Sequence, residues 1–230
     1  MTGLDLLNAR KRRGITQRQV AQELGVTQAY VSMLEKERRH LPAHVVSQVL
    51  RQYEVDPLAL PLHGKESWSE LDSARLTTQL ASLGYPGFAY MRAQSTWNPS
   101  ELLIASLAKD NLETRVAEAL PWLVLNYDKM DWNWVMDESK LRDAQNRLGF
   151  TVTLARKVAE RNGLSVATSR LASLENRLQR SKLEHVGTFC NERMSTAEKQ
   201  WLQNRSTPEA KQWNILSDLA PEHLAHVTSA

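Results

Sequence analysis

Residues 16–42 read TQRQVAQELGVTQAYVSMLEKERRHLP, and this stretch decides the fold of the N-terminal part of the chain. Apolar residues recur at helical spacing on both sides of Gly25. Glycine adopts the left-handed backbone conformation of a tight turn at little cost. The stretch therefore predicts two short helices joined at Gly25. The side chains that can pack them together are Val20, Ala21, Leu24, Val26, Val31 and Leu34.

The side chains that remain form an outward face that is uncharged at its centre and basic at its edges. A helix with such a face fits the major groove of DNA, where base edges lie between two rows of phosphates. The pattern therefore favours a helix-turn-helix that binds DNA. The alternative is a motif used for protein contact, which leaves Gln28 and the basic loop without a function. The outward residues are Gln17, Arg18, Thr27, Gln28, Ala29, Ser32, Met33 and Lys36.

Charge is distributed unevenly along the chain. Residues 1–56 contain nine Lys or Arg and six Asp or Glu, which gives +3. Because the whole chain also carries +3, residues 57–230 are balanced. The basic surplus therefore coincides with the DNA-binding pattern. A surplus this small favours a sequence-specific reader with a few phosphate contacts over a nonspecific DNA coat.

Local sequence signals give the bounds of the N-terminal helices. Thr16 and Gln19 have the spacing of a capping box, which marks a helix start. Gly14 and Gly25 are the turn residues that follow the first two helices, and Leu41-Pro42 closes the third. Helices are expected up to about residue 13, over residues 17–24, from residue 27 to near Glu37, and over residues 43–53.

Residues 4–60, about a quarter of the chain, resemble the lambda-repressor-like, Cro/XRE-type helix-turn-helix. Family members often carry glycine where this chain has Glu37, which implies either a longer third helix or a differently shaped loop. The matching residues are Gln17, Val20, Ala21, Leu24, Gly25, Val26, Thr27, Val31, Ser32, Leu34, Glu35, Arg38 and Arg39.

The resemblance implies roles for individual residues. Bases are expected to be read from the first turns of the third helix, where Gln28 can bond adenine and Ala29 can touch a thymine methyl group. Arg38 and Arg39, with His40 beside them, are expected to meet the DNA backbone. The expected base-reading residues are Gln28, Ala29, Ser32 and Met33. The expected phosphate-binding residues are Gln17, Arg18, Thr27, Lys36, Arg38 and Arg39.

The rest of the chain has helical periodicity almost throughout, after a proline-containing linker at residues 57–66. Gly149 is expected to end one helix, and Pro121 to kink or break another. No alternating strand pattern appears, so seven or eight helices are expected. The fold class is therefore all-α, with a lambda-repressor-like helix-turn-helix domain at residues 1–62. A larger all-helical domain follows at residues 63–230.

Several features of the second part have two interpretations. One of Trp132 and Trp134 can face a partner, although packing between helices is the simpler account. Leu171, Leu174 and Leu178 have coiled-coil spacing but fit an ordinary packed helix. His223 and His226 have the spacing of metal ligands without the rest of a ligand set. The arginines at positions 142, 147, 156 and 161 alternate with acids, as on a solvated helix face.

Composition and motifs exclude several classes of protein. The sequence has no apolar run long enough for a transmembrane helix, and its N-terminus does not resemble a secretory signal. One cysteine, Cys190, allows no internal disulfide and fits the cytoplasm. Phosphate-loop, dinucleotide-binding, zinc-protease and serine-hydrolase motifs are missing. We therefore expect no enzyme activity, no cofactor, no metal and no membrane association.

These features together predict a cytoplasmic transcriptional regulator that binds double-stranded DNA. We expect a homodimer on a pseudo-palindromic operator that acts as a repressor or autoregulator. The layout is similar to antitoxins of toxin–antitoxin or defence operons, so the second domain is expected to bind a protein partner through an exposed apolar patch. The alternatives are a small-molecule sensor with an enclosed apolar cavity and an enzyme tethered to DNA.

Overall fold

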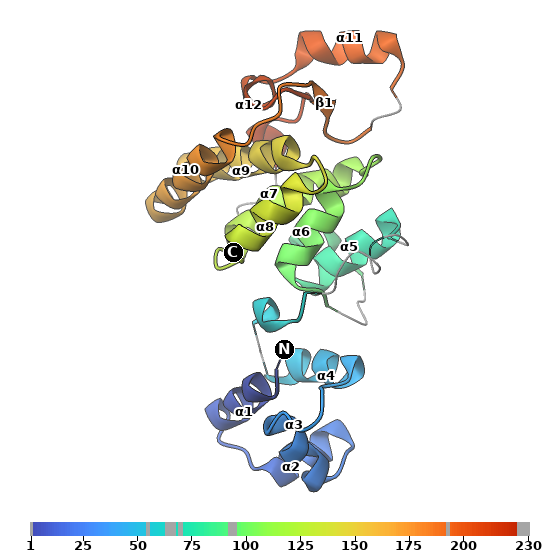
Figure 1. The fold of residues 1–230 in the computed structure, drawn as a ribbon, viewed down its shortest axis with the longest axis vertical. Coiled ribbons are helices and arrows are strands. Elements are labelled where there is room, and N and C mark those ends of the chain that lie inside the picture. The colour runs from blue at the N-terminus through green and yellow to red at the C-terminus, as the bar shows by residue number, and fades with distance from the viewer. Residues whose placement is uncertain are drawn as a thin grey trace.

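The computed structural model describes residues 2–53, 56–62, 68, 71–91, 96–191 and 194–224; at residues 43, 44, 47 and 51 it describes the backbone alone. Nearly all regular structure in these residues is helical, which confirms the all-α fold class. Figure 1 shows the N-terminal helices at one end of an elongated molecule and the other helices stacked beyond them. Buried apolar side chains form two separate clusters, one within residues 6–60 and one within residues 68–224. We refer to these two parts as the head and the body.

The head is built from short helices that begin at well-formed caps. The capping box expected at Thr16 is present, because its hydroxyl accepts from the Gln19 N–H and the Gln19 side chain accepts from the Thr16 N–H at 2.8 Å. Thr2 and Asp5 form an equivalent box at the first helix. The helices of the head are α1 (Gly3–Arg12), α2 (Gln17–Leu24), α3 (Gln28–Glu35) and α4 (Ala43–Tyr53), followed by the 3₁₀ turn η1 (Pro57–Ala59).

The first three helices end in the same way, with one residue in the left-handed conformation. These residues are Gly14 (φ 65°), Gly25 (φ 66°) and, after α3, Glu37 (φ 56°). The N–H groups of Glu37 and Arg38 then bond back to the last turn of α3 at 3.0 and 2.9 Å, which completes a Schellman motif. Of the two alternatives that Glu37 implied, a longer third helix or a differently shaped loop, the structure shows the loop. The helix ends at Glu35, and Glu37 itself adopts the conformation that glycine favours.

Glu37→Gly should stabilise the head. A residue with a side chain loses roughly 1–2 kcal/mol of stability when it adopts the left-handed conformation. Glycine avoids this loss, but part of the gain is offset because glycine makes the unfolded chain more flexible. We expect the free energy of unfolding to rise by about 0.5–1 kcal/mol, measured as a higher urea midpoint at unchanged slope. Glu37→Ala keeps the Cβ atom and should show no such gain. A loss of stability in Glu37→Gly would show that the glutamate side chain itself supports the loop.

The body is an assembly of helices around α9. One two-stranded parallel ladder, with Gly187 beside Ile215, joins distant parts of its C-terminal half. Its α-helices are α5 (Ser73–Ser82), α6 (Pro99–Leu107), α7 (Thr114–Asn126), α8 (Trp132–Lys140), α9 (Gln145–Arg161), α10 (Ser165–Gln179), α11 (Thr196–Arg205) and α12 (Pro208–Gln212). The other elements are η3 (Pro86–Phe88), η4 (Pro221–His223), β1 (Gly187–Thr188) and β2 (Ile215–Leu216).

Helix α9 corrects the prediction that Gly149 ends a helix. The helix runs from Gln145 to Arg161 without interruption. Its glycine makes room for the indole ring of Trp213, because a Cβ atom at position 149 would lie 2.3 Å from that ring. The indole is fully buried and donates its N–H to the Thr153 hydroxyl at 2.7 Å. Close packing of a distant tryptophan, rather than a helix end, therefore accounts for this glycine.

Helix α7 includes Pro121 without a break in its assigned residues. Burial decides two other interpretations. The leucine seam of α10 is buried and packs on α9, which confirms the ordinary packed helix. The solvated arginine face is wrong at Arg147, which is 9% exposed. Its guanidinium donates to the backbone oxygens of Thr188, Leu107 and Lys109 at 2.8–2.9 Å and so ties three segments together.

The segment that connects the head to the body is held to the body by hydrogen bonds. Asn98 caps α6, and its Nδ2 donates to the backbone oxygens of Leu58 at 3.1 Å and Leu60 at 2.8 Å. Leu60 belongs to the apolar cluster of the head, whereas Leu58 packs against that of the body. The described part of the expected linker, residues 57–62, is therefore a strap that both parts hold.

Candidate nucleic-acid interface

Helix α3 presents the residues expected to contact bases. Gln28 and Ala29 in its first turn are exposed, and Ser32 and Met33 in the next turn are half-buried. Residues four apart on a helix share a face, so the two pairs form one continuous stripe. The apolar side of the helix is buried in the head. The structure thus brings all four expected base-reading residues together on one surface.

Thr27 begins α3 and retains a hydrogen-bond donor. Its hydroxyl oxygen accepts from the Tyr30 N–H at 3.2 Å, which caps the helix. A hydroxyl group has one donor hydrogen besides its acceptor positions. The O–H of this exposed side chain can therefore be donated to a phosphate oxygen while the cap stays in place.

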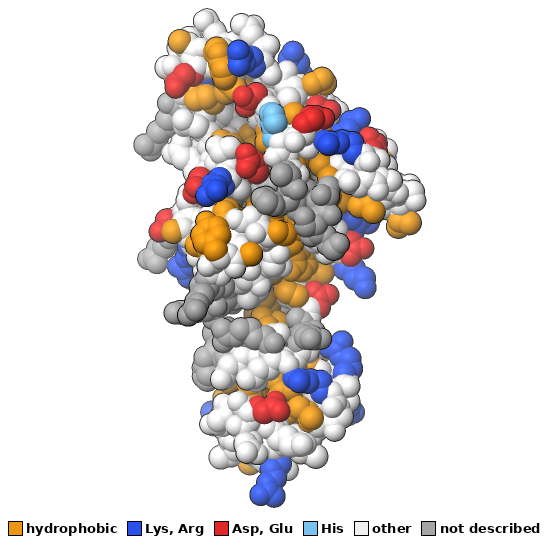
Figure 2. All heavy atoms as spheres, turned by 180° about the vertical axis from the view of Figure 1, so that it is seen from behind, with side chains coloured by type: hydrophobic (Ala, Val, Ile, Leu, Met, Phe, Trp, Pro, Cys, Tyr) orange, Lys and Arg blue, Asp and Glu red, His pale blue; other side chains and the backbone are white. Residues whose placement is uncertain are grey.

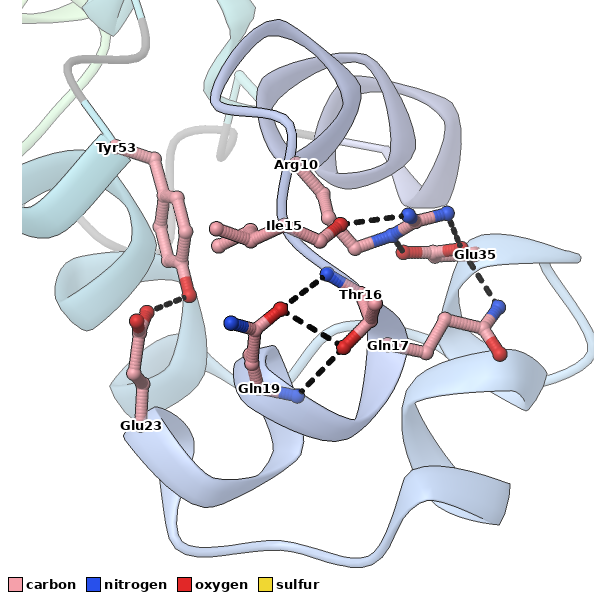
Figure 3. Close-up of polar contacts among 8 residues, drawn as sticks. All are labelled: Arg10, Ile15, Thr16, Gln17, Gln19, Glu23, Glu35 and Tyr53. Carbon is pink, nitrogen blue, oxygen red and sulfur yellow. Dashed lines mark hydrogen bonds and ion pairs between the residues drawn. The ribbon is translucent and has the colours of Figure 1, made fainter.

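A buried carboxylate links the first three helices of the head (Figure 3). Glu35, 6% exposed, accepts from Arg10 Nε at 2.6 Å and from Arg10 Nη2 at 3.1 Å. Arg10 also donates through Nη1 to the backbone oxygen of Ile15 at 3.0 Å. Gln17, at the start of α2, donates through Nε2 to the same carboxylate at 2.9 Å. These contacts fix the orientation of α3 relative to α1 and α2.

The network changes the interpretation of two positions. Gln17 is half-buried and donates one hydrogen of its amide group to Glu35. Its second amide hydrogen can be donated to a phosphate oxygen. From the sequence alone, Glu35 is a position that matches the family and has no assigned role. Arg10 contributes only to the basic surplus of residues 1–56. The available signal was the placement of Glu35 four residues after Val31, which puts a charged residue on the buried side of α3.

The charge of this carboxylate is stabilised inside the head. Burial alone would raise the pKa of Glu35, but hydrogen bonds from Arg10 and Gln17 outweigh it and hold the pKa below its ordinary value. Glu35 is therefore ionised at neutral pH and keeps both partners in place.

A second polar contact ties α4 to α2. The Tyr53 hydroxyl donates to the Glu23 carboxylate (Figure 3), and burial together with this contact raises the pKa of Tyr53. The Arg13 guanidinium lies 5.0 Å from the Tyr53 ring and bonds the Gln52 backbone oxygen. Arg13 is thus used within the head, although it belongs to the basic surplus.

Four basic side chains of the motif, one at the start of α2 and three directly after α3, are free. They are exposed, and none of them takes part in an ion pair within the described residues. Free cations on both sides of a reading helix are suited to bind the phosphates that border a groove. The four residues are Arg18, Lys36, Arg38 and Arg39.

Two absences concern the described residues. No cluster of three or more His, Cys, Asp or Glu side chains there is arranged to hold a metal ion; His226 lies outside the described residues. Nor does any helix described here combine the length and apolarity that crossing a bilayer requires.

Comparison with known proteins agrees with this geometry. A family model described as helix-turn-helix matches residues 6–60. Neither a curated protein nor a solved structure matches the chain. The matched segment coincides with α1 to η1 and includes the reading stripe, the buried network and the free cations. Residues 6–60, about a quarter of the chain, therefore form a helix-turn-helix domain of the Cro/XRE type, and this match supports a DNA-binding transcription regulator.

Proposed function

We propose that the protein is a sequence-specific repressor that inserts α3 into the major groove of its operator. The observation that carries this proposal is the exposed stripe of α3 between free cations. The exposed amide of Gln28 suits the paired donor and acceptor of adenine, and Ala29 leaves room for a thymine methyl group. Ser32 and Met33 extend the base-reading surface by one turn.

The phosphate contacts of this proposal come from both ends of the motif. Arg18 and Gln17 lie at the start of α2, and Thr27 opens α3. Beyond α3 the Schellman turn at Glu37 places Lys36, Arg38 and Arg39 in one exposed loop. These six contacts would position the head on the duplex, whereas the stripe would read its sequence.

The second element of the proposal is a homodimer on a pseudo-palindromic site. One head contacts only a few base pairs, so two heads on half-sites about 34 Å apart supply both affinity and site length. We assign residues 1–62 to the DNA-binding domain and residues 63–230 to dimerisation and partner binding. The two separate apolar clusters support this division.

The body fits a protein partner better than a small effector. Four hollows in its described part have volumes of about 200, 250, 410 and 420 Å³, and all four are partly open to solvent, whereas a sensor needs an enclosed pocket. Exposed apolar side chains on the body include Leu164, Val166 and Trp201. We therefore place the chain among autoregulators whose body binds an operon product, as antitoxins do. Effector sensing is the alternative.

Gln28→Ala should weaken binding to the preferred operator by about 1–3 kcal/mol, because the variant loses a paired contact to one base. Discrimination at that base position should fall, whereas binding to unrelated duplexes should stay the same. Competition binding with operators altered one base pair at a time measures both effects. Unchanged discrimination would remove Gln28 from the base-reading residues.

Arg38→Ala with Arg39→Ala should weaken binding to all duplexes alike. Binding releases about one counterion fewer for each phosphate contact that is lost. The magnitude of the slope of log affinity against log salt should therefore fall by about two. The matched control is Lys157→Ala with Arg161→Ala, which removes two charges from body ion pairs with Glu160 and Glu222. Equal slopes in the two double variants would contradict a DNA contact by this loop.

A further inference from the structure

Helix α11 is scarcely covered by its own chain. None of its ten residues is buried. Leu202, half-buried, faces the body across a hollow of about 200 Å³ that Met194 and Cys190 also line. An isolated helix shorter than about 12–15 residues is marginal in water. The capping box of Ser195 and Glu198 supports its first turn, but the helix as a whole lacks a packed face.

The tryptophan that is exposed on the body belongs to this helix. Trp201 is 51% exposed, whereas Trp132 and Trp134 are half-buried against the body's apolar cluster. The guanidinium of Arg205 lies 4.5 Å from the Trp201 ring. Seen from behind, the end of the molecule that carries α11 shows hydrophobic and basic side chains next to each other (Figure 2). Tryptophan and arginine are both enriched at protein interfaces relative to the rest of the surface.

The outward side of α11 is complementary to itself. Glu198, Trp201 and Arg205 lie three and four residues apart, so they share one side of the helix. The acid is in the first turn and the base is in the last turn. When a second α11 lies antiparallel to the first, each Glu198 meets the Arg205 of the other copy and the two Trp201 rings meet between them. The helix dipoles also oppose each other in this arrangement.

We propose that α11 pairs with α11 of a second copy of this chain about a twofold axis. This inference rests on the homodimer of the proposed function and names its surface. The symmetry requires that one patch match itself, and the order acid, tryptophan, base meets this requirement. One pair of ten-residue helices buries less than the roughly 1,200 Å² of a standard interface. The dimer should therefore dissociate on dilution, and joint binding to two half-sites should strengthen it.

The test is sedimentation of the full chain over a range of concentrations. Glu198→Lys places like charges opposite Arg205, and Arg205→Glu places like charges opposite Glu198. Each variant alone should dissociate at least tenfold more readily than the wild type. An equimolar mixture should recover the dimer, because both contacts between the two variants are then attractive. Recovery on mixing also excludes misfolding as the cause of the loss. Ser195→Ala, which removes the cap without changing charge, should remain dimeric.

The outcomes separate the surface from the proposed function. A wild-type dimer that neither variant weakens, or a loss that mixing does not repair, would overturn the α11 interface and leave the homodimer in place. A wild type that is monomeric in solution, and also on DNA with two half-sites, would overturn the homodimer itself. Wild-type association with a different protein alone would assign α11 to that partner instead.

Discussion

Glu35→Ala is expected to unfold the head and abolish operator binding while the body stays folded. The substitution leaves the Arg10 guanidinium without the carboxylate that it contacts at 2.6 and 3.1 Å. Breaking a buried ion pair costs about 3–5 kcal/mol, which is as much as one small core supplies. All seven tryptophans lie at residues 68–213, so their fluorescence reports on the body alone. We expect a partial loss of helical circular dichroism at unchanged fluorescence.

An exposed ion pair provides the control for Glu35→Ala. Asp137 lies 3.2 Å from Lys140, and their side chains are 74% and 46% exposed. Because water screens such a pair, Asp137→Ala should cost less than about 1 kcal/mol. Arg10→Met with Glu35→Leu, which replaces both charges by apolar groups, should recover much of the lost stability. A folded Glu35→Ala head that still binds its operator would contradict the structural role of the network.

The same carboxylate makes the stability of the head depend on pH. The pKa of Glu35 is lower in the folded head than its ordinary value, because the bonds from Arg10 and Gln17 outweigh the effect of burial. Its contribution is therefore present above the unfolded-state pKa and is lost as the pH falls through the folded-state pKa. We expect the stability advantage of the wild-type head over the head with Arg10→Met and Glu35→Leu to shrink in acid, measured by urea unfolding at several pH values.

Trp213→Ala is expected to destabilise the body by about 3–5 kcal/mol, the usual cost of truncating a buried aromatic residue. The indole is fully buried, packs on Gly149 and donates to Thr153 at 2.7 Å. The variant loses the packing and leaves the threonine hydroxyl without its donor. Urea unfolding followed by circular dichroism and by the remaining tryptophans measures the effect. A loss below about 1 kcal/mol would show that the body does not depend on this contact.

Gly149→Ala tests the same contact through a change of sign. In the wild-type background the added methyl group meets the Trp213 ring, so it should destabilise the body by about 1–3 kcal/mol. In the Trp213→Ala background the ring is gone, and alanine in a helix interior is favoured over glycine by about 0.5–1 kcal/mol. There the same substitution should stabilise. Equal effects of Gly149→Ala in both backgrounds would show that Gly149 and Trp213 do not interact energetically.

The head could be predicted from sequence because its signals are local. The capping box of Thr16 and Gln19 marks the start of α2, and Gly25 marks its end. Each signal involves residues within or next to the helix itself. The exposed stripe follows from the spacing of Val31 and Leu34 on the other side of α3. The end of α3 stayed open between two alternatives because Glu37 takes a conformation that its side chain disfavours. The residue type at position 37 therefore gave no sign of the left-handed backbone conformation there.

The remaining features depend on contacts between distant residues. The interpretation of Gly149 as a helix end was reasonable locally, but Trp213, 64 residues later, decides it. Arg147 shows the same effect, since its partners are backbone oxygens that no side-chain pattern reveals. The Glu35 network was also missed, because the pairing of Glu35 with Arg10 appears only when α1 and α3 are packed.

The central claim is that the head reads a particular DNA sequence, and selection from genomic DNA tests it most directly. The purified full chain is incubated with fragments of its source genome at about 0.15 M salt, near physiological ionic strength, and the retained fragments are sequenced. We predict enrichment of one or a few palindromic sites, with half-sites about 34 Å apart, including a site beside the gene itself. The Gln28→Ala chain, selected in parallel, should lose this preference at one base position of each half-site. Retention without sequence preference, or no retention, would contradict a DNA-reading role for α3.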